Sequence, residues 1–198
     1  PIVTAWNHRP LSHSPFPFVL VDALYLKIRE DGRVVNRGVM VGVGINEEGQ
    51  RELLGLMVGD TESEESWTEF FRWLKQRGLH GVDLVVSDDH GGLVRAIRKQ
   101  LQGVVWQRCQ THFMRNIMNA APKELKNEIY THVRAILEAP DPETARILLQ
   151  QTIATFGEKA ARAIRTLETG FDDATAVLSL PEKYRKRLRT TNSVERLN

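Results

Sequence analysis

The sequence predicts an α/β core that is followed by a helical segment. Apolar residues recur at every second position in the first third of the chain, which is typical of strands buried on one face. Helical periodicity then alternates with short apolar runs, and from residue 111 to about residue 169 the pattern is helical throughout. With 41% hydrophobic and 26% charged residues among 198 positions, the chain can support one or two packed domains.

The first third is predicted to form three consecutive antiparallel strands. Asp31-Gly32 is a turn signal that joins the first two strands into a hairpin, and residues 46–50 provide a second turn. Strands that are joined by such short turns pair with each other in an antiparallel sheet. The predicted strands cover residues 18–28, 34–45 and 51–58.

Helices and strands alternate in the next segment. It opens with an amphipathic helix whose aromatic side chains face the core, with Ser63 or Thr61 as its N-cap and Gly78 as its stop signal. A continuous apolar run then predicts a buried strand, and a second helix and a short strand follow. The predicted order is βββαβαβ, with helices at residues 63–77 and 93–101 and later strands at 82–87 and 104–106.

The region 111–169 is predicted to be helical, with breaks at Pro122 and just before Asp141. Asp141 can cap the helix that follows it. A loop through Gly170 and Pro181 is expected to lead into the last segment of the chain.

Three acidic residues occupy positions at which an ordinary soluble fold seldom places a carboxylate. Asp22 lies in an apolar strand, on the same face as Leu20 and Leu24, where burial of an uncompensated charge is costly. Asp88 stands at the end of the predicted buried strand, and Glu195 opens a basic helix. A carboxylate in a place such as that of Asp22 needs a proton, a cation or a metal ion.

Each of these acids also has a purely structural explanation. Asp22 could form a buried ion pair with an arginine, and Asp88 or Asp89 could cap the following helix. Asn192-x-x-Glu195 is a capping box, in which the asparagine side chain and the glutamate carboxylate each meet a backbone N–H group. Taken alone, this spacing favours a cap for Glu195.

Taken together, the three acids suggest a metal-dependent site that cleaves phosphodiesters. Hydrolysis and strand transfer are in-line displacements at phosphorus. Two divalent ions about 3.5 to 4 Å apart can activate the attacking oxygen and stabilise the leaving oxygen. Hard oxygen ligands suit Mg²⁺, or Mn²⁺ in its place, because such ions keep part of their shell for water and for the substrate phosphate. The expected cofactor is therefore Mg²⁺ or Mn²⁺.

The distribution of charge indicates a nucleic-acid partner more strongly than its sum does. The formal net charge is only +2, but basic residues gather between Lys183 and Arg196, with Tyr184 interleaved. Such a segment suits a phosphate backbone. A solvated helix face explains the same pattern about equally well.

The single cysteine and the lack of long apolar runs exclude several classes. Cys109 cannot form an intrachain disulfide, and Cys109-x-x-His112 has no second pair nearby to complete a structural zinc site. No run approaches the roughly 18 apolar residues that span a bilayer, so an intracellular, soluble protein is expected. Because the chain begins at Pro1 and stops one turn into a predicted helix, both ends are expected to be cut from a longer protein.

The chain resembles a known fold and a known family. The order βββαβαβ, with an acid in the first strand and another after the fourth, resembles the ribonuclease-H-like (retroviral-integrase-like) fold, a mixed sheet with flanking helices. That resemblance implies that the first and fourth strands are neighbours. Three blocks resemble the Mutator-like (MULE-type) transposases of bacterial insertion sequences, namely residues 87–93, Cys109-Gln110-Thr111-His112 and residues 189–198, and residues 21–25 match the family's first acid.

The family resemblance implies an Asp-Asp-Glu catalytic core with an all-helical domain inserted before the glutamate. Asp22 would bridge two ions, and Asp88 and Glu195 would each serve one. The implied organisation is a first core part at 1–110, the helical insertion at 111–180 and the return to the core at 181–198, with an N-terminal DNA-binding region and a C-terminal tail absent.

The resemblance also implies the partners and the DNA-binding residues. The partners are terminal inverted repeats, target DNA and other transposase subunits in a homo-oligomer on DNA, in the bacterial cytoplasm at the nucleoid, with no membrane. Recognition of the repeats would belong to the absent N-terminal region. The residues expected to contact DNA are His90, Cys109, His112 and Asn192 beside the active centre, and Lys186, Arg187, Arg189 and Arg196 from the basic segment. An ordinary packed cysteine and a surface histidine explain Cys109 and His112 about equally well.

Alternatives remain at this point. A domesticated or truncated transposase could retain DNA binding without catalysis, although the intact acid set argues against this. Another ribonuclease-H-like nuclease, acting on RNA, is disfavoured by the helical insertion and by the block at 192–198. Trp106 could stack on an unpaired base, but tryptophans at such spacings more often fill cores.

Overall fold

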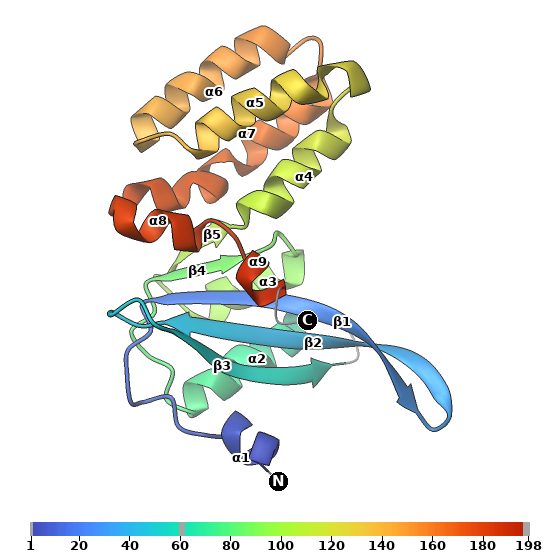
Figure 1. The fold of residues 1–198 in the computed structure, drawn as a ribbon, viewed down its shortest axis with the longest axis vertical. Helices are drawn as coiled ribbons and strands as arrows, with labels where there is room; N and C mark the ends of the chain where they lie inside the picture. Colours follow the sequence, from blue (N-terminus) through green and yellow to red (C-terminus); the bar gives the residue numbers. More distant parts are fainter. Residues whose placement is uncertain (1, 60–61, 196–198) are drawn as a thin grey trace. The chain divides into compact units, whose positions relative to one another are not determined.

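The computed structural model describes residues 2–59 and 62–195, except for the side chains of residues 28, 30, 193 and 195 (Figure 1). The chain divides into two compact units. The first contains Pro1–Trp106 and Thr191–Asn198, and the second contains Gln107–Thr190. In sequence, the second unit is therefore inserted between two parts of the first.

The first unit is built on a five-stranded mixed sheet. Its elements are β1 (Phe18–Glu30), β2 (Arg33–Ile45), β3 (Arg51–Gly59), α2 (Glu64–Gln76), β4 (Leu84–Ser87), α3 (Gly91–Gln100) and β5 (Val105–Arg108). The strand order is β3-β2-β1-β4-β5; β1, β2 and β3 pair antiparallel, and β4 pairs parallel with β1. The order βββαβαβ is confirmed. A short helix that the sequence pattern did not predict, α1 (Ile2–Asn7), precedes it.

One face of the sheet packs against α2 and α3 through a continuous apolar core. Val19 and Val21 of β1 are fully buried in this core. The aromatic side chains of α2 fill it from the other side, as predicted, with ring centroids 5.5 to 6.1 Å apart among Trp67, Phe70 and Phe71. Because side chains alternate along a strand, the residues between these valines and beyond them face the opposite side of the sheet.

The contact between α2 and α3 depends on a glycine. A Cβ atom at Gly92 would lie 2.7 Å from the backbone nitrogen of Glu64 and 3.0 Å from the carbonyl carbon of Ser63. These are backbone atoms at the start of α2, so they cannot move aside as the end of a flexible side chain can. Gly92 therefore permits the close approach of the two helices.

We expect Gly92→Ala to lower the free energy of unfolding by about 1 to 3 kcal/mol, because the added methyl group overpacks a backbone contact. Gly91→Ala is the matched control, since a Cβ there would meet only the guanidinium of Arg95 at 3.2 Å. Denaturant unfolding of both variants measures the difference. Equal stability of the two variants would show that α2 and α3 can separate at no cost.

The second unit begins with the last two residues of β5 and is helical beyond them. Its elements are α4 (Gln110–Ala120), η1 (Lys123–Leu125), α5 (Lys126–Leu137), α6 (Pro142–Phe156), α7 (Ala161–Thr175), η2 (Ala176–Ser179) and α8 (Glu182–Leu188). α4 packs on α7, and α5 packs on α6. The predicted cap of α6 is confirmed, because the Asp141 carboxylate accepts a hydrogen bond from the Thr144 backbone N–H at 2.8 Å. No helix among the described residues is long and apolar enough to cross a membrane.

Two details of this unit differ from the expectation. The helical region is interrupted between α6 and α7, at residues 157–160. Gly170, which was expected in a loop, lies inside α7 and is buried. A Cβ atom there would come within 2.5 Å of the Phe113 ring and 2.7 Å of the Arg108 guanidinium, so this glycine serves close packing and not a turn.

Candidate active site

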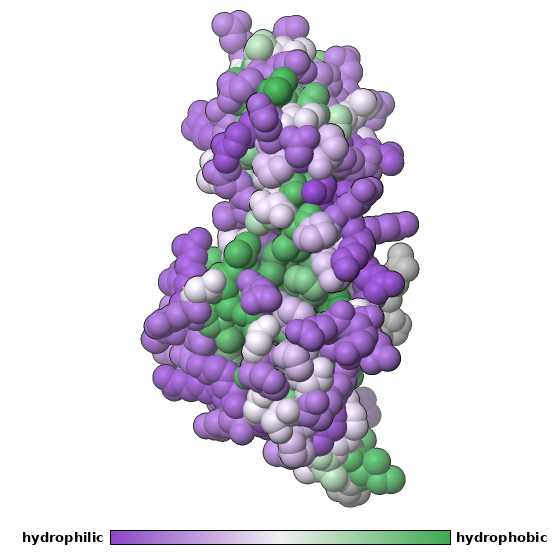
Figure 2. All heavy atoms as spheres, turned by 90° about the vertical axis from the view of Figure 1, so that its left-hand side faces the viewer, coloured by the Kyte–Doolittle hydropathy of each residue, from purple (hydrophilic) through white to green (hydrophobic). Residues whose placement is uncertain are grey.

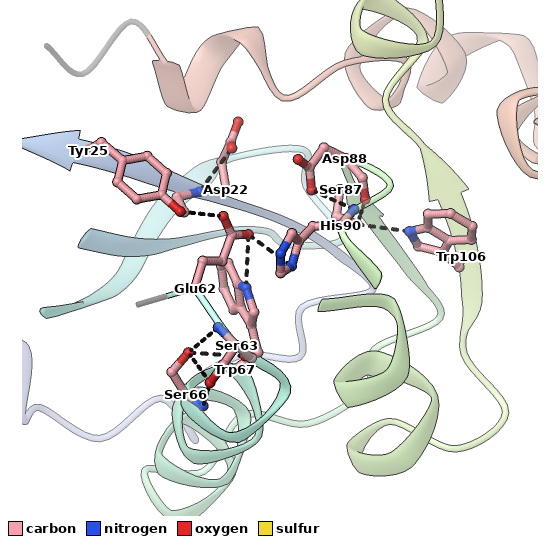
Figure 3. A network of polar contacts seen from close by, with 11 residues as sticks. Asp22, Tyr25, Glu62, Ser63, Ser66, Trp67, Ser87, Asp88, His90 and Trp106 are labelled. Atoms are coloured by element: carbon pink, nitrogen blue, oxygen red, sulfur yellow. Dashed lines mark hydrogen bonds and ion pairs between the residues drawn. The ribbon is translucent and has the colours of Figure 1, made fainter. Parts of the chain in front are cut away.

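The parallel pairing of β1 with β4 brings two of the predicted acids together. The pairing aligns Phe18 with Leu84 and continues to the pair of Leu20 and Val86. Asp22 and Asp88 each lie two residues beyond that last pair, so the same register places them at neighbouring positions. Figure 3 shows both carboxyl groups on the same side of the two strands.

Asp22 is held inside the sheet. It pairs with Val41 of β2, and only 7% of its surface is exposed. Its Oδ1 atom accepts a hydrogen bond from the Ala23 backbone N–H at 2.9 Å. Since Val21 points into the core under α2 and α3, Asp22 points to the other face of the sheet. The structure thus gives this carboxylate a fixed position on a rigid central strand.

Asp88 stands directly after β4, where the loop to α3 begins. Its Oδ1 atom accepts from the His90 backbone N–H at 3.3 Å. The N-cap of α3 is His90, so neither Asp88 nor Asp89 caps this helix, and that structural explanation was wrong. A capping residue directly precedes the first helical residue, which is Gly91 in α3, so Asp89 lies one residue and Asp88 two residues before the capping position.

The end of β4 is anchored to β5 by Trp106. Its indole N–H donates to Ser87 Oγ at 2.9 Å, and the Ser87 hydroxyl donates to the Asp88 carbonyl oxygen at 2.8 Å. Trp106 is 9% exposed and belongs to the apolar core. It therefore supports the strand end that carries Asp88 and is not placed to stack on a base.

The third predicted acid ends a short helix that returns to the sheet. This helix, α9 (Asn192–Glu195), packs against β1 and β2, and Val194 is fully buried. Figure 1 shows α9 on the face of the sheet opposite to α2 and α3. Because Val21 faces the core under α2 and α3, the next residue, Asp22, points to the face that carries α9. The side chain of Glu195 and the whole of Arg196 lie outside the described residues.

Asn192 does not form its half of the predicted capping box. It is the first residue of α9 and not the residue before it. Its Oδ1 atom is buried, and no donor within the described part of the chain reaches it. Of the two reciprocal hydrogen bonds of a capping box, the one to the Asn192 side chain is therefore not formed within the described residues. This weakens the case for Glu195 as a cap.

A fourth carboxylate, Glu62, lies near this site and was not predicted. It precedes the N-cap of α2, Ser63, and its side chain is only 11% exposed. It accepts hydrogen bonds from the Tyr25 hydroxyl at 3.0 Å and from the Trp67 indole N–H at 3.1 Å, and His90 Nδ1 lies 3.6 Å from its Oε1 atom (Figure 3). In sequence it resembles any solvated acid at a helix start, so no local pattern reveals its burial.

The contact with Glu62 is expected to change the pKa of the Tyr25 phenol measurably. Burial, the hydrogen bond to Glu62 and the negative charges of Glu62 and Asp88 raise the pKa of the Tyr25 phenol. Ultraviolet titration of the phenolate, with Tyr25→Phe subtracted as reference, should show ionisation above the ordinary pKa of about 10. Glu62→Gln should lower that pKa.

The sign of the linked stability follows from the raised pKa. Only the neutral phenol donates to Glu62, so this contact stabilises the fold at neutral pH and is lost as the pH rises through the raised pKa of Tyr25. An ordinary pKa for Tyr25, or one that Glu62→Gln leaves unchanged, would contradict the contact.

The other predicted DNA-binding residues, except His90 and Asn192, lie in the second unit or outside the described residues. Cys109 is buried at the N-cap of α4, and His112 is half-buried in the first turn of that helix. Lys186 and Arg187 are exposed on α8, and the carbonyl oxygen of the adjoining Arg189 accepts from the Gln110 backbone N–H at 2.8 Å. Hydrophilic side chains cover most of the helical unit, the upper part of Figure 2, on the face shown there.

The basic residues of α8 border a pocket within this unit. It lies between α4, α5 and the end of α8, and its basic lining consists of Arg134, Lys186 and Arg189. The Nε atom of Arg189 is buried, and no acceptor among the described residues meets it. Arg134 pairs at 3.1 Å with Glu138, which lines the same pocket, so Lys186 and Arg189 are the cations of this group that suit a polyanion.

The two described acids, Asp22 and Asp88, suit a hard divalent ion. Asp22 and Asp88 offer carboxylate oxygens from adjacent strands, which is the donor chemistry that Mg²⁺ and Mn²⁺ prefer. Within residues 2–59 and 62–195, no cluster of three His, Cys, Asp or Glu side chains could hold a metal ion. The predicted third ligand, Glu195, falls outside the described side chains.

Comparisons with known proteins give one consistent result. All 198 residues match the family described as "Transposase, Mutator family". The chain is 41% identical over 200 residues to the transposase for insertion sequence element IS256 in transposon Tn4001 of Staphylococcus aureus, covering 100% of this chain and 51% of the relative. It is 39% identical to the transposase for IS1081 of Mycobacterium tuberculosis, covering 99% and 47% of the two chains.

A further relative is the transposase for IS406 of Burkholderia multivorans, which is 38% identical and is matched over 98% of this chain and 50% of its own length. The chain thus spans about half the length of the curated relatives it matches. Among solved structures, a simian T-cell lymphotropic virus intasome in complex with PP2A regulatory subunit B56 gamma aligns with 66% of this chain and 51% of its own, at 10% identity and a TM-score of 0.32. That similarity is too low to bear on the fold.

Proposed function

Because this chain belongs to the Mutator family of transposases, we propose that it forms the catalytic core of an enzyme that cleaves and joins DNA at insertion-sequence ends. The observation that carries the proposal is the parallel pairing of β1 with β4, whose register leads to Asp22 and Asp88. The strand order and the return of α9 to the sheet further support a ribonuclease-H-like core. The all-helical second unit then corresponds to an insertion between Asp88 and Glu195.

Asp22, Asp88 and Glu195 are the proposed ligands for Mg²⁺ or Mn²⁺. When bound, the metal ions polarise the scissile phosphate and favour ionisation of the attacking oxygen. The protein contributes by holding Asp22 on a central strand and Asp88 at an anchored strand end, so that little reorganisation is needed during reaction. Water or a DNA 3′-hydroxyl acts as the nucleophile, without a covalent protein intermediate.

The helical unit is proposed to bind the DNA backbone. Lys186, Arg187 and Arg189 supply cations for phosphates, a contact that does not depend on base sequence. His90, Cys109, His112, Asn192 and Arg196 are the further proposed contacts near the cleaved strand. The proposed partners are terminal inverted repeats, target DNA and further copies of the transposase, and the proposed place of action is the bacterial nucleoid.

The test incubates the full-length protein with Mg²⁺ and labelled DNA that carries the ends of its element. The expected products are nicked ends and joined strands, both abolished by EDTA and restored by Mn²⁺. Binding without cleavage would indicate a catalytically inactive DNA-binding protein instead. Degradation without joining, or a preference for RNA, would indicate another kind of nuclease.

A further inference from the structure

Glu62 is a half-buried carboxylate at the junction of three elements. It accepts hydrogen bonds from Tyr25 of β1 and Trp67 of α2, and His90 in the loop between β4 and α3 faces it. Together these contacts fix the carboxylate and offset the cost of burying its charge. The chain therefore holds a carboxyl group at this position with two hydrogen-bond donors and a facing imidazole, although Asp22 and Asp88 already carry the proposed chemistry.

His90 connects this carboxylate to the second acid. Its Nδ1 atom lies 3.6 Å from Glu62 Oε1, which is beyond hydrogen-bond distance and makes an ion pair when the imidazole is protonated, and its backbone N–H donates to Asp88 Oδ1 at 3.3 Å. Figure 3 shows the His90 ring beside the Glu62 carboxylate and its backbone next to Asp88. A contact that fixes the His90 ring therefore also restrains the His90 backbone N–H group, which donates to Asp88.

We propose that Glu62 is a positioning residue, which holds His90 by its ring and thereby sets the orientation of the Asp88 carboxylate through the His90 backbone N–H. This inference rests on the proposed role of Asp88 as a metal ligand. Groups that hydrogen-bond to ligating residues tune metal affinity and activity without touching the metal, and their loss typically costs about 10 to 100-fold.

The neighbouring loop explains why such support is needed. Asp88 lies one residue beyond the end of β4, in the loop that leads to α3. Asp22, in contrast, is paired on β1 with Val41 of β2. Of the two described acids, Asp88 is thus the one whose geometry depends on side-chain and loop contacts.

The experiment measures Mn²⁺ affinity by electron paramagnetic resonance, and Mg²⁺-dependent cleavage in parallel, in a double-mutant cycle of Glu62→Gln and His90→Ala. Glu62→Gln should weaken Mn²⁺ binding and slow cleavage by about 10 to 100-fold. In the His90→Ala background, Glu62→Gln should cause no further loss, because the route to Asp88 is already interrupted. Glu64→Gln is the matched control, since Glu64 begins α2 and pairs with Arg95 at the surface.

Other results would overturn the proposal. A full second loss in the His90→Ala background would show that Glu62 acts directly on the metal or independently of His90. Mn²⁺ affinity and cleavage unchanged in Glu62→Gln, while Asp22→Asn abolishes both, would show that Glu62 is only structural. If Asp22→Asn itself leaves Mn²⁺ binding unchanged, the proposed active site fails, and that failure is distinct. Should Glu62→Gln unfold, Glu62→Asp replaces it in the cycle. The shorter side chain withdraws the carboxylate from His90 while the charge is retained, so Mn²⁺ binding should again weaken.

Discussion

Asp22→Asn is expected to abolish metal-dependent DNA cleavage while the protein remains folded. The substitution keeps the size of the side chain but removes its negative charge, so the proposed divalent ion would lose its proposed ligand on the central strand. We expect the cleavage rate to fall by roughly 10²- to 10³-fold or more, the scale on which loss of one preorganised electrostatic group acts. Single-turnover cleavage of labelled element ends measures the effect.

Thermal unfolding without metal provides the second measurement for Asp22→Asn. Because Asp22 and Asp88 lie at neighbouring positions, removing one negative charge should leave the melting temperature unchanged or raise it. Asp83→Asn is the control, since Asp83 is an exposed acid just before β4. Cleavage near the wild-type rate in Asp22→Asn would contradict a catalytic role for this residue.

Glu195→Gln is expected to have an effect of similar size on cleavage, again with the fold retained. The helix that ends at Glu195 packs on β1 and β2, on the face to which Asp22 points. Glutamine can still accept a hydrogen bond from a backbone N–H, so a mere cap would survive the substitution, whereas a metal ligand would not. The rate of cleavage in Mg²⁺ and in Mn²⁺ therefore separates the two roles.

The control for Glu195→Gln is Glu182→Gln, which changes an exposed acid in the first turn of α8. Both variants should unfold at the wild-type temperature, and only Glu195→Gln should lose cleavage. If Glu195→Gln cleaves DNA as fast as the wild type, Glu195 serves the helix alone, and the Asp-Asp-Glu assignment is wrong.

The strand and helix order could be predicted because each element has a strong local signal. Turn residues such as Asp31-Gly32 and an N-cap such as Ser63 mark boundaries, and the aromatic spacing of α2 identifies its buried face. The pairing of β1 with β4 was inferred only through the fold resemblance, since no periodicity encodes which strands become neighbours. The structure confirms that pairing.

Features that depend on tertiary packing could not be predicted. Gly170 has the local signature of a helix end, but it lies inside α7 because Phe113 and Arg108 approach its backbone. Glu62 has the signature of a solvated acid, and its burial depends on Tyr25, Trp67 and His90, which are distant in sequence or follow another strand. In both cases the deciding atoms come from elsewhere in the chain.

The most direct test of the central claim is a crystal structure of the protein grown with Mn²⁺, in which anomalous scattering locates the ions. Manganese is expected at the end of β4, bound by carboxylate oxygens of Asp22, Asp88 and Glu195, with Glu62 beside His90 and outside the ligand shell. Manganese bound elsewhere, or three carboxylates that do not converge on a common ion site, would contradict it.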